Sequence, residues 1–226
     1  MALWRFAAWN VWDLYRSESR AEEIRQKRLY PAITDTVRPD ILGVQEIIAP
    51  ADGGGDALKR LTDATGMIPG TVARGHQIAP QDLYYWVGLL WAEDIQVKPG
   101  SERDYRGEMW HNLVTSVIVV DGVTMRVGSY HAPPFGRYCR SDEAERVVSA
   151  FTRPRPPMPG IYGSDSNGLS GDRVQRPDGI WVLYDRIRRG KAASVLLTST
   201  LLFRAAVGGA KATADMIGRP TVVIEG

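Results

Sequence analysis

Polar side chains follow four apolar stretches of the sequence, at the points where β-strands are expected to end. They are Asn10, Glu46, His131, and Asp165 with Asn167. If these ends meet at one edge of a sheet, the site holds carboxylates, amides and an imidazole. Oxygen ligands of this kind favour Mg²⁺ or Mn²⁺ over Zn²⁺. The amides and the imidazole can donate hydrogen bonds to a phosphate group during transfer.

Each of these residues also has an ordinary structural interpretation. A lone asparagine such as Asn10 is more often a turn residue than a ligand. Glu46 can face solvent, and His131 can bond a nearby backbone carbonyl. Asp165 and Asn167, between glycines, can belong to a simple turn. The functional interpretation therefore depends on the residues taken together.

The elements that would position these side chains are strands interrupted by a few helices. Asp121-Gly122 between two β-branched runs predicts a hairpin. Strands are expected at Leu3–Val11, Asp40–Glu46, Tyr84–Val97, Leu113–Val120, Val123–Tyr130, Ile161–Asp165, Gly179–Ile187, Ala193–Leu202 and Thr221–Glu225. Helices are expected at Glu18–Val37, after the glycine-containing loop Ala51–Asp56, and from Ser141, with Ala144, Val147, Val148 and Phe151 as the buried stripe.

This order of elements predicts an α/β protein with two mixed β-sheets packed face to face and helices outside. The 226 residues suit a single domain, 1–226. Hydrophobic residues make up 44% of the chain and charged residues 24%, which excludes a disordered or fibrous class.

Net charge and cysteine content narrow the expected cellular location but do not identify a binding partner. The net charge is only +2, although the stretch from Arg137 to Lys191 is mildly basic and would suit a polyanion. Cys139 is the only cysteine, so no internal disulfide or thiolate zinc site can form. A reducing, cytoplasmic location is expected. No apolar run is long enough for a membrane span, and the oligomeric state stays open.

Four segments together resemble the endonuclease/exonuclease/phosphatase family. They are Ala8–Val11, Pro39–Glu46 (PDILGVQE), Val127–His131 and Gly163–Asn167 (GSDSN). Their order and spacing agree across nearly the whole chain. The resemblance implies a four-layer α/β/β/α sandwich and a phosphoesterase that uses a divalent metal, Mg²⁺ or Mn²⁺.

The resemblance also implies roles for individual residues. Glu46 would be the principal metal ligand, with Asn10 beside it and Asp215 as a further acidic ligand and catalytic residue. Tyr184–Ile187 resembles the Tyr-Asp-Arg-Ile of pancreatic-type deoxyribonucleases, in which the aspartate, here Asp185, supports a C-terminal histidine.

Four residues would act on the substrate according to the same resemblance. His131 would hydrogen-bond the scissile phosphate, and Asn167 would hold it. Asp165 would orient or deprotonate the attacking water. His111, just before the expected hairpin, is a further candidate for a phosphate contact.

The sequence departs from the family at its C-terminal histidine. Asp215 is retained, but Met216 stands where the histidine is expected. A thioether cannot transfer a proton, so activity is expected to be weakened, or lost in a binding relative. Restoring the imidazole with Met216→His is expected to raise activity at least about tenfold, the low end for one acid/base group.

A nuclease acting on nucleic acid is the favoured function. The alternatives are a phosphatase or lipid phosphodiesterase on the same fold, and a non-catalytic binding relative. Most tryptophans are expected in the core and at its rim. Trp12 and Trp110, next to the proposed site segments, are the exceptions that could stack on bases.

Overall fold

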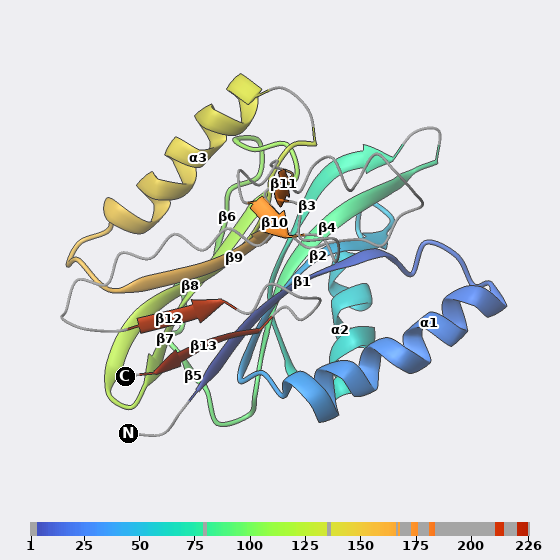
Figure 1. Ribbon diagram of the computed structural model, residues 1–226, viewed down its shortest axis with the longest axis horizontal. Helices are drawn as coiled ribbons and strands as arrows, with labels where there is room; N and C mark the ends of the chain where they lie inside the picture. Colours follow the sequence, from blue (N-terminus) through green and yellow to red (C-terminus); the bar gives the residue numbers. More distant parts are fainter. Residues whose placement is uncertain are drawn as a thin grey trace.

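A computed structural model of the chain describes residues 4–78, 81–134, 137–165, 167, 173–175, 181–183, 211–214 and 221–225. Two β-sheets lie face to face at its centre, and helices cover their outer faces (Figure 1). The larger sheet has the strand order β12-β13-β1-β2-β4-β3, and the smaller one has the order β5-β7-β8-β9, with β6 paired to β7. Strands β10 and β11 pair with each other.

The strands differ widely in length. The strands of the larger sheet are β1 Arg5–Leu14, β2 Ile41–Ala49, β3 Ile68–Ile78, β4 Leu83–Trp91, β12 Lys211–Ala214 and β13 Thr221–Glu225. Those of the smaller sheet are β5 Gln96–Val97, β6 Arg103–Asp104, β7 Leu113–Val120, β8 Val123–His131 and β9 Gly160–Asp165. The separate pair is β10 Arg173–Gln175 and β11 Trp181–Leu183.

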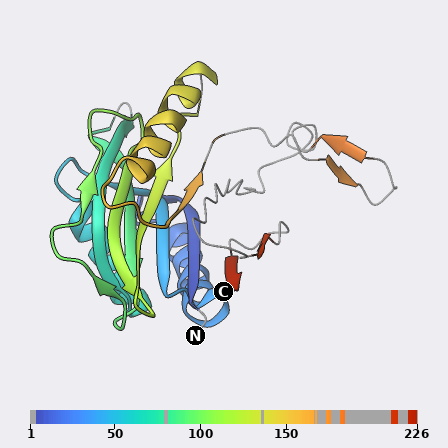
Figure 2. The same cartoon turned by 90° about the vertical axis from the view of Figure 1, so that its left-hand side faces the viewer.

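Three apolar clusters mark the three interfaces between four layers. The middle cluster joins the two sheets through side chains such as Phe6, Ile41 and Val87 from one and Val114 and Val127 from the other. Because successive residues of a strand face opposite sides, Leu42 and Val44 of β2 pack instead against the helices on the outer face. The third cluster packs α3 on the smaller sheet (Figure 2). The predicted α/β/β/α sandwich of two mixed sheets is confirmed.

The first helical region begins after a serine that caps it, and its geometry changes at a proline. Ser19 accepts a hydrogen bond from the backbone N–H of Glu22 and caps α1, Arg20–Pro31. Pro31 lacks a backbone N–H, and the chain continues as a π-helical segment, η1, Ala32–Val37. The predicted helix Glu18–Val37 is therefore correct in extent but not uniform.

The other two helices cover opposite sheets. Helix α2, Gly54–Thr65, packs on the larger sheet and begins inside the predicted loop Ala51–Asp56, earlier than expected. Helix α3 spans Arg137–Thr152, so Ser141 lies inside it and the prediction that Ser141 caps it is wrong. The predicted stripe is also partly wrong, because Val148 is 44% exposed and Ala144 is exposed. The buried positions are Glu143, Val147 and Ala150.

Two strands differ from the expectation for physical reasons. Strand β3 has no counterpart in the sequence analysis, because its segment lacks a regular apolar pattern and contains two glycines and Pro69. Such a strand is tolerated at a sheet edge, where β3 lies. The predicted strand Tyr84–Val97 is divided, since a turn after Trp91 separates β4 from β5. The hairpin at Asp121-Gly122 and the strand Thr221–Glu225 are confirmed.

Parts of the predicted pattern lie outside the described residues. These are the strand Ala193–Leu202 and all of Gly179–Ile187 except β11. Among the helices that the described residues form, none combines the length and apolarity needed to cross a lipid bilayer.

The two sheets approach each other closely beside the polar strand ends. A Cβ on Gly163 of β9 would lie 2.0 Å from the Cβ of Ala8 on β1, so only glycine fits there. A Cβ on Gly43 of β2 would lie 3.1 Å from the Cβ of Ser129 on β8. Two residues further along three of these strands stand Asn10, His131 and Asp165. The close packing thus brings these side chains toward one another from opposite sheets.

Candidate active site

The candidate site lies where two pairs of parallel strands end. Strand β1 runs parallel to β2, and β8 runs parallel to β9, with His131 opposite Asp165 in the register. Parallel neighbours place their carboxyl ends at the same edge of a sheet, where ligands bind in many α/β proteins. The face-to-face packing of the sheets then brings both edges together.

Irregularities in β1 and β2 direct two of the side chains into this edge. The β1–β2 register shifts between Asn10 and Leu14, and the β2–β4 register shifts between Val44 and Ile47. Glu46 has a φ of 64°, a conformation that costs a non-glycine residue energy. Such bulges re-aim a side chain at a sheet rim, and here the re-aimed carboxylate belongs to Glu46.

Asn10 bridges the two carboxylates of the site. Its Nδ2 donates to Glu46 Oε1 at 2.8 Å and to Asp165 Oδ2 at 2.6 Å. Its Oδ1 accepts from the backbone N–H of Trp12 at 2.8 Å. In this arrangement Asn10 fixes the separation of the carboxylates, and its predicted role as a direct metal ligand stays a prediction.

Asn167 holds the other side of the site. Its backbone N–H donates to Asp165 Oδ1 at 2.8 Å, and its Nδ2 donates to the backbone oxygen of Ala132 at 2.8 Å. The same Nδ2 lies 3.1 Å from His131 Nε2. Asn167 therefore links the end of β9 to the end of β8, and it has a φ of 44°.

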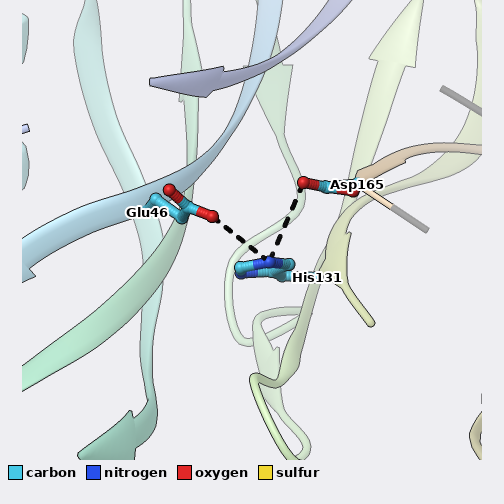
Figure 3. A group of neighbouring side chains, drawn as sticks. All are labelled: Glu46, His131 and Asp165. Carbon is cyan, nitrogen blue, oxygen red and sulfur yellow. Dashed lines mark ion pairs between the residues drawn. The ribbon is translucent and has the colours of Figure 1, made fainter. Parts of the chain in front are cut away.

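Glu46, His131 and Asp165 point toward one another in Figure 3. His131 Nε2 lies 3.7 Å from Glu46 Oε1 and 3.9 Å from Asp165 Oδ2. Two ligand atoms that bind one ion at ~2.1 Å lie about 3.0–4.2 Å apart, so these separations suit a small divalent cation. The three residues form a group that could hold a metal.

Burial determines the charge state of these groups. It raises the pKa of Glu46 to about 7, an effect to which the nearby carboxylates of Asp13 and Asp165 add. It lowers the pKa of His131 to about 3, so the ring is neutral near pH 7. A neutral imidazole between two carboxylates leaves their repulsion uncompensated, and a bound cation would relieve it.

All three histidines of the sequence come together beside this group. The rings of His111 and His131 stack at 4.1 Å with an interplanar angle of 9°. His76 meets His111 edge-on at 6.2 Å and stacks on Trp110 at 4.2 Å. Burial lowers the pKa of His111 to about 2, and His131 and His76 reinforce this. The Nδ1 atoms of His111 and His131 are buried without a hydrogen-bond partner among the described residues.

Sequence reasoning missed three residues at the site. Tyr85 meets His111 edge-on at 5.1 Å, bonds Asp13, and has its pKa raised by burial to about 12. Asp13 also contacts Glu46 through its backbone N–H. Asn112, with a φ of 89°, accepts from the backbone N–H of His131 through its own carbonyl. Tyr85 reaches the site from strand β4, and no local pattern in the sequence reveals this. Asn112, by contrast, adjoins the candidate residue His111.

The structure thus brings together six of the predicted site residues. They are Asn10, Glu46, His111, His131, Asp165 and Asn167. The remaining ones, Asp185 and Asp215, lie outside the described residues, as does Met216. Their predicted roles stay predictions.

A four-layer sandwich with these strand ends at one edge is the fold of the endonuclease/exonuclease/phosphatase proteins, and this chain has that fold. A family protein from Bacteroides thetaiotaomicron matches with a TM-score of 0.52 and 14% identity over 76% of this chain and 66% of that one. The human Nocturnin catalytic domain matches with a TM-score of 0.54 and 15% identity, over 75% and 67%.

A mannosyl-6-phosphatase from Bacteroides thetaiotaomicron matches with a TM-score of 0.51 and 14% identity, over 75% of this chain and 67% of that one. The chain therefore spans about two thirds of the length of these solved structures. No protein-family model matches the sequence, and neither does any curated protein. The likeness is one of fold.

Proposed function

We propose that this protein is a hydrolase of phosphate esters that depends on a divalent metal ion. The observation that carries this proposal is the convergence of Asn10, Glu46, His131, Asp165 and Asn167 from both sheets. Solved proteins of this fold include ones named as phosphatases, which agrees with the proposal. The substrate and the metal are inferred from the chemistry of the site.

Glu46 and Asp165 would hold Mg²⁺ or Mn²⁺, both of which are bound by carboxylate oxygens. Such an ion, when bound, neutralises charge on the phosphate and on the leaving oxygen. Asn10 keeps the two carboxylates at the separation the ion needs. Glu46 must lose its proton for the site to bind a cation, and its pKa of about 7 permits this near neutral pH.

His131 and Asn167 are the donors that would meet the phosphate. Their 3.1 Å contact keeps an amide and a neutral imidazole side by side, which suits hydrogen bonding to phosphate oxygens. In this scheme Asp165 orients the attacking water and accepts its proton. Asp185 and Asp215 keep the roles predicted above, and Met216 in place of the expected histidine would weaken catalysis.

Nucleic acid is the substrate class that we favour. Trp12 follows the site residue Asn10 closely, is 50% exposed and has a φ of 46°. An exposed tryptophan held in a costly conformation beside a phosphate site suits stacking on a base. His76, which meets His111 edge-on, is exposed and stacks on the half-buried Trp110. The mildly basic stretch from Arg137 to Lys191 also favours a polyanion.

A phosphomonoesterase is the second candidate, because a sugar phosphatase shares the fold. A phosphate monoester needs no exposed stacking ring, so the two candidates differ in their dependence on Trp12. For either function we propose a single domain in a reducing, cytoplasmic setting, where the exposed thiol of Cys139 would stay reduced.

The test is an assay of the purified chain on single-stranded DNA, duplex DNA, RNA and a sugar phosphate. Activity should require Mg²⁺ or Mn²⁺, disappear with excess chelator and be abolished by Glu46→Ala. Glu93→Ala, an exposed carboxylate in the turn after β4, is the matched control and should leave activity unchanged. Trp12→Ala should raise KM for nucleic acid only.

Three results would contradict parts of this proposal. Undiminished activity in excess chelator would exclude the metal role. Hydrolysis of the sugar phosphate alone, insensitive to Trp12→Ala, would establish the phosphatase candidate. No hydrolysis of any substrate with either metal, together with nucleic-acid binding, would identify a non-catalytic binding protein.

A further inference from the structure

Helix α3 carries a buried carboxylate at a position where an apolar residue would be ordinary. Glu143 is 4% exposed, while Asp142, Ala144 and Glu145 around it are exposed. It lies in the stripe that packs on the smaller sheet, four residues before the fully buried Val147. Burying a carboxylate costs free energy unless hydrogen bonds compensate for the lost water. The partners of Glu143 are therefore informative.

The two carboxylate oxygens bond to two different parts of the chain. Oε1 accepts from the backbone N–H of Trp110 at 2.6 Å, in the loop before β7. Oε2 accepts from the Tyr130 hydroxyl at 2.8 Å, near the end of β8. Burial raises the pKa of Glu143, and these two bonds oppose that effect by stabilising the charged form.

Each of the two bonded residues directly precedes a histidine of the site. Trp110 precedes His111, and Tyr130 precedes His131, whose rings stack at 4.1 Å. The loop that carries His111 and the strand that carries His131 are thus tied to the same carboxylate. A shift of either segment would slide one ring relative to the other.

The stacked rings also have contacts of their own, since His131 Nε2 lies 3.1 Å from Asn167 Nδ2 and His111 meets Tyr85 edge-on. Both Nδ1 atoms lack hydrogen-bond partners among the described residues, so no bond at that atom fixes either ring. The backbone N–H of His131 does bond the Asn112 carbonyl, which anchors the main chain there. That bond already joins the two histidine-bearing segments through the main chain, and the carboxylate of Glu143 adds a second connection to both segments from helix α3.

We propose that Glu143 is a positioning residue that sets the relative placement of His111 and His131. Its effect on hydrolysis rests on the proposed function, whereas its effect on the two rings does not. Helix α3 is also docked by apolar contacts of Val147 and Ala150 with Leu113. Attachment of the helix therefore does not by itself require a buried carboxylate.

The experiment compares Glu143→Ala, Glu143→Gln, Tyr130→Phe and the exposed control Glu145→Gln. Because the chain has only three histidines, their ring C–H signals in an NMR spectrum can be assigned with single His→Gln variants. Glu143→Ala should shift the signals of His111 and His131. Glu143→Gln, which keeps one acceptor oxygen, and Tyr130→Phe, which removes one bond, should give smaller shifts. Glu145→Gln should give none.

Hydrolysis supplies the second readout. Small misplacement of catalytic groups costs up to about 100-fold in rate, so kcat should fall ~10–100-fold in Glu143→Ala with KM within about twofold. Glu143→Gln should recover part of that loss. Unchanged His111 and His131 signals in a folded Glu143→Ala or Tyr130→Phe protein would overturn the inference. Shifted signals in a protein without any hydrolysis would retain it and refute the proposed function instead.

Discussion

Residues with a positive φ angle occur at both ends of the β7–β8 hairpin, but they are of different types at the two ends. At the turn end, Asp121 and Gly122 have φ angles of 48° and 77°. At the site end and beside it, Asn112, Glu46 and Trp12 also have positive φ. Glycine and aspartate adopt this conformation at little cost, whereas tryptophan and glutamate do so at roughly 1–2 kcal/mol each.

The difference shows which property each end requires. The turn needs only a backbone shape, and its residues are the ones a two-residue hairpin favours. The site end needs particular side chains at particular points, so the backbone bends around them. Strained non-glycine residues beside a cluster of buried polar groups are typical of functional sites. Changes at the site end should therefore alter activity, and changes at the turn should alter stability.

The largest effect is expected for Asp165→Asn at the site end. Losing one acid/base or electrostatic group lowers rates by about 10²–10⁴-fold, and kcat should fall within that range. The matched change at the turn, Asp121→Asn, keeps a residue that tolerates positive φ and should leave kcat unchanged. Steady-state kinetics of both variants provide the measurement. Comparable losses in the two would contradict the division between the ends.

A stability gain is expected for Glu46→Gln in the metal-free protein. Burial raises the pKa of Glu46 from 4.5 to about 7. The folded state therefore holds this proton more tightly than the unfolded state, and stability is lost as pH rises from about 4.5 to 7. Removing the charge should add up to about 3 kcal/mol at pH 8 and almost nothing at pH 4.

Urea unfolding with chelator at both pH values measures that gain. Mg²⁺ should stabilise the wild type at pH 8 by binding the folded state, and it should not stabilise Glu46→Gln. A wild type more stable than Glu46→Gln at pH 8 without metal would show that the charge of Glu46 does not destabilise the folded protein. The sign of the difference is thus the informative result.

His111→Phe should make the protein less sensitive to acid. Burial lowers the pKa of His111 from 6.5 to about 2. Unfolding therefore takes up a proton below pH 6.5, and stability is lost as pH falls. The loss is about 2 kcal/mol between pH 6.5 and 5. Phenylalanine keeps a stacking ring without this proton uptake, so the free energy of unfolding in urea should change less with pH in His111→Phe than in the wild type.

The smallest effect is expected at the turn. Gly122 has open space around its Cα, so Gly122→Ala suffers only from the positive φ. The expected loss is about 1 kcal/mol of stability with no change in kcat. Thermal unfolding and the hydrolysis assay measure the two quantities. A drop in kcat beyond the change in folded fraction would mean that the two ends are coupled through the hairpin.

Much of the fold follows from local patterns in the sequence. The apolar residues of Asp40–Glu46 and the Asp121-Gly122 turn are local features, and the arrangement in two sheets was predicted from such features. Strand β3 was not, because its position at a sheet edge removes the need for an apolar pattern. The start of α3 was also missed, since the serine that could cap it lies within the helix.

The candidate site shows a similar limit. Asn10, Glu46, His131 and Asp165 could be chosen because each ends an apolar run and the order of the segments resembles a family. Glu143 could not, because a glutamate on a helix ordinarily faces water and only the packing of α3 buries it. Tyr85 likewise lies at the site only because β4, which carries it, pairs with β2. Contacts made across the fold carry no signal in the neighbouring sequence.

Strand β13 pairs antiparallel with β1, joining Val223 to Arg5 and Thr221 to Ala7. During synthesis, β1 emerges long before its partner, and until then one side of it presents unpaired backbone groups. The larger sheet therefore cannot close around β1 until residues 211–225 have left the ribosome. A nascent or prematurely terminated chain offers that open strand to other molecules, and open strand edges promote aggregation.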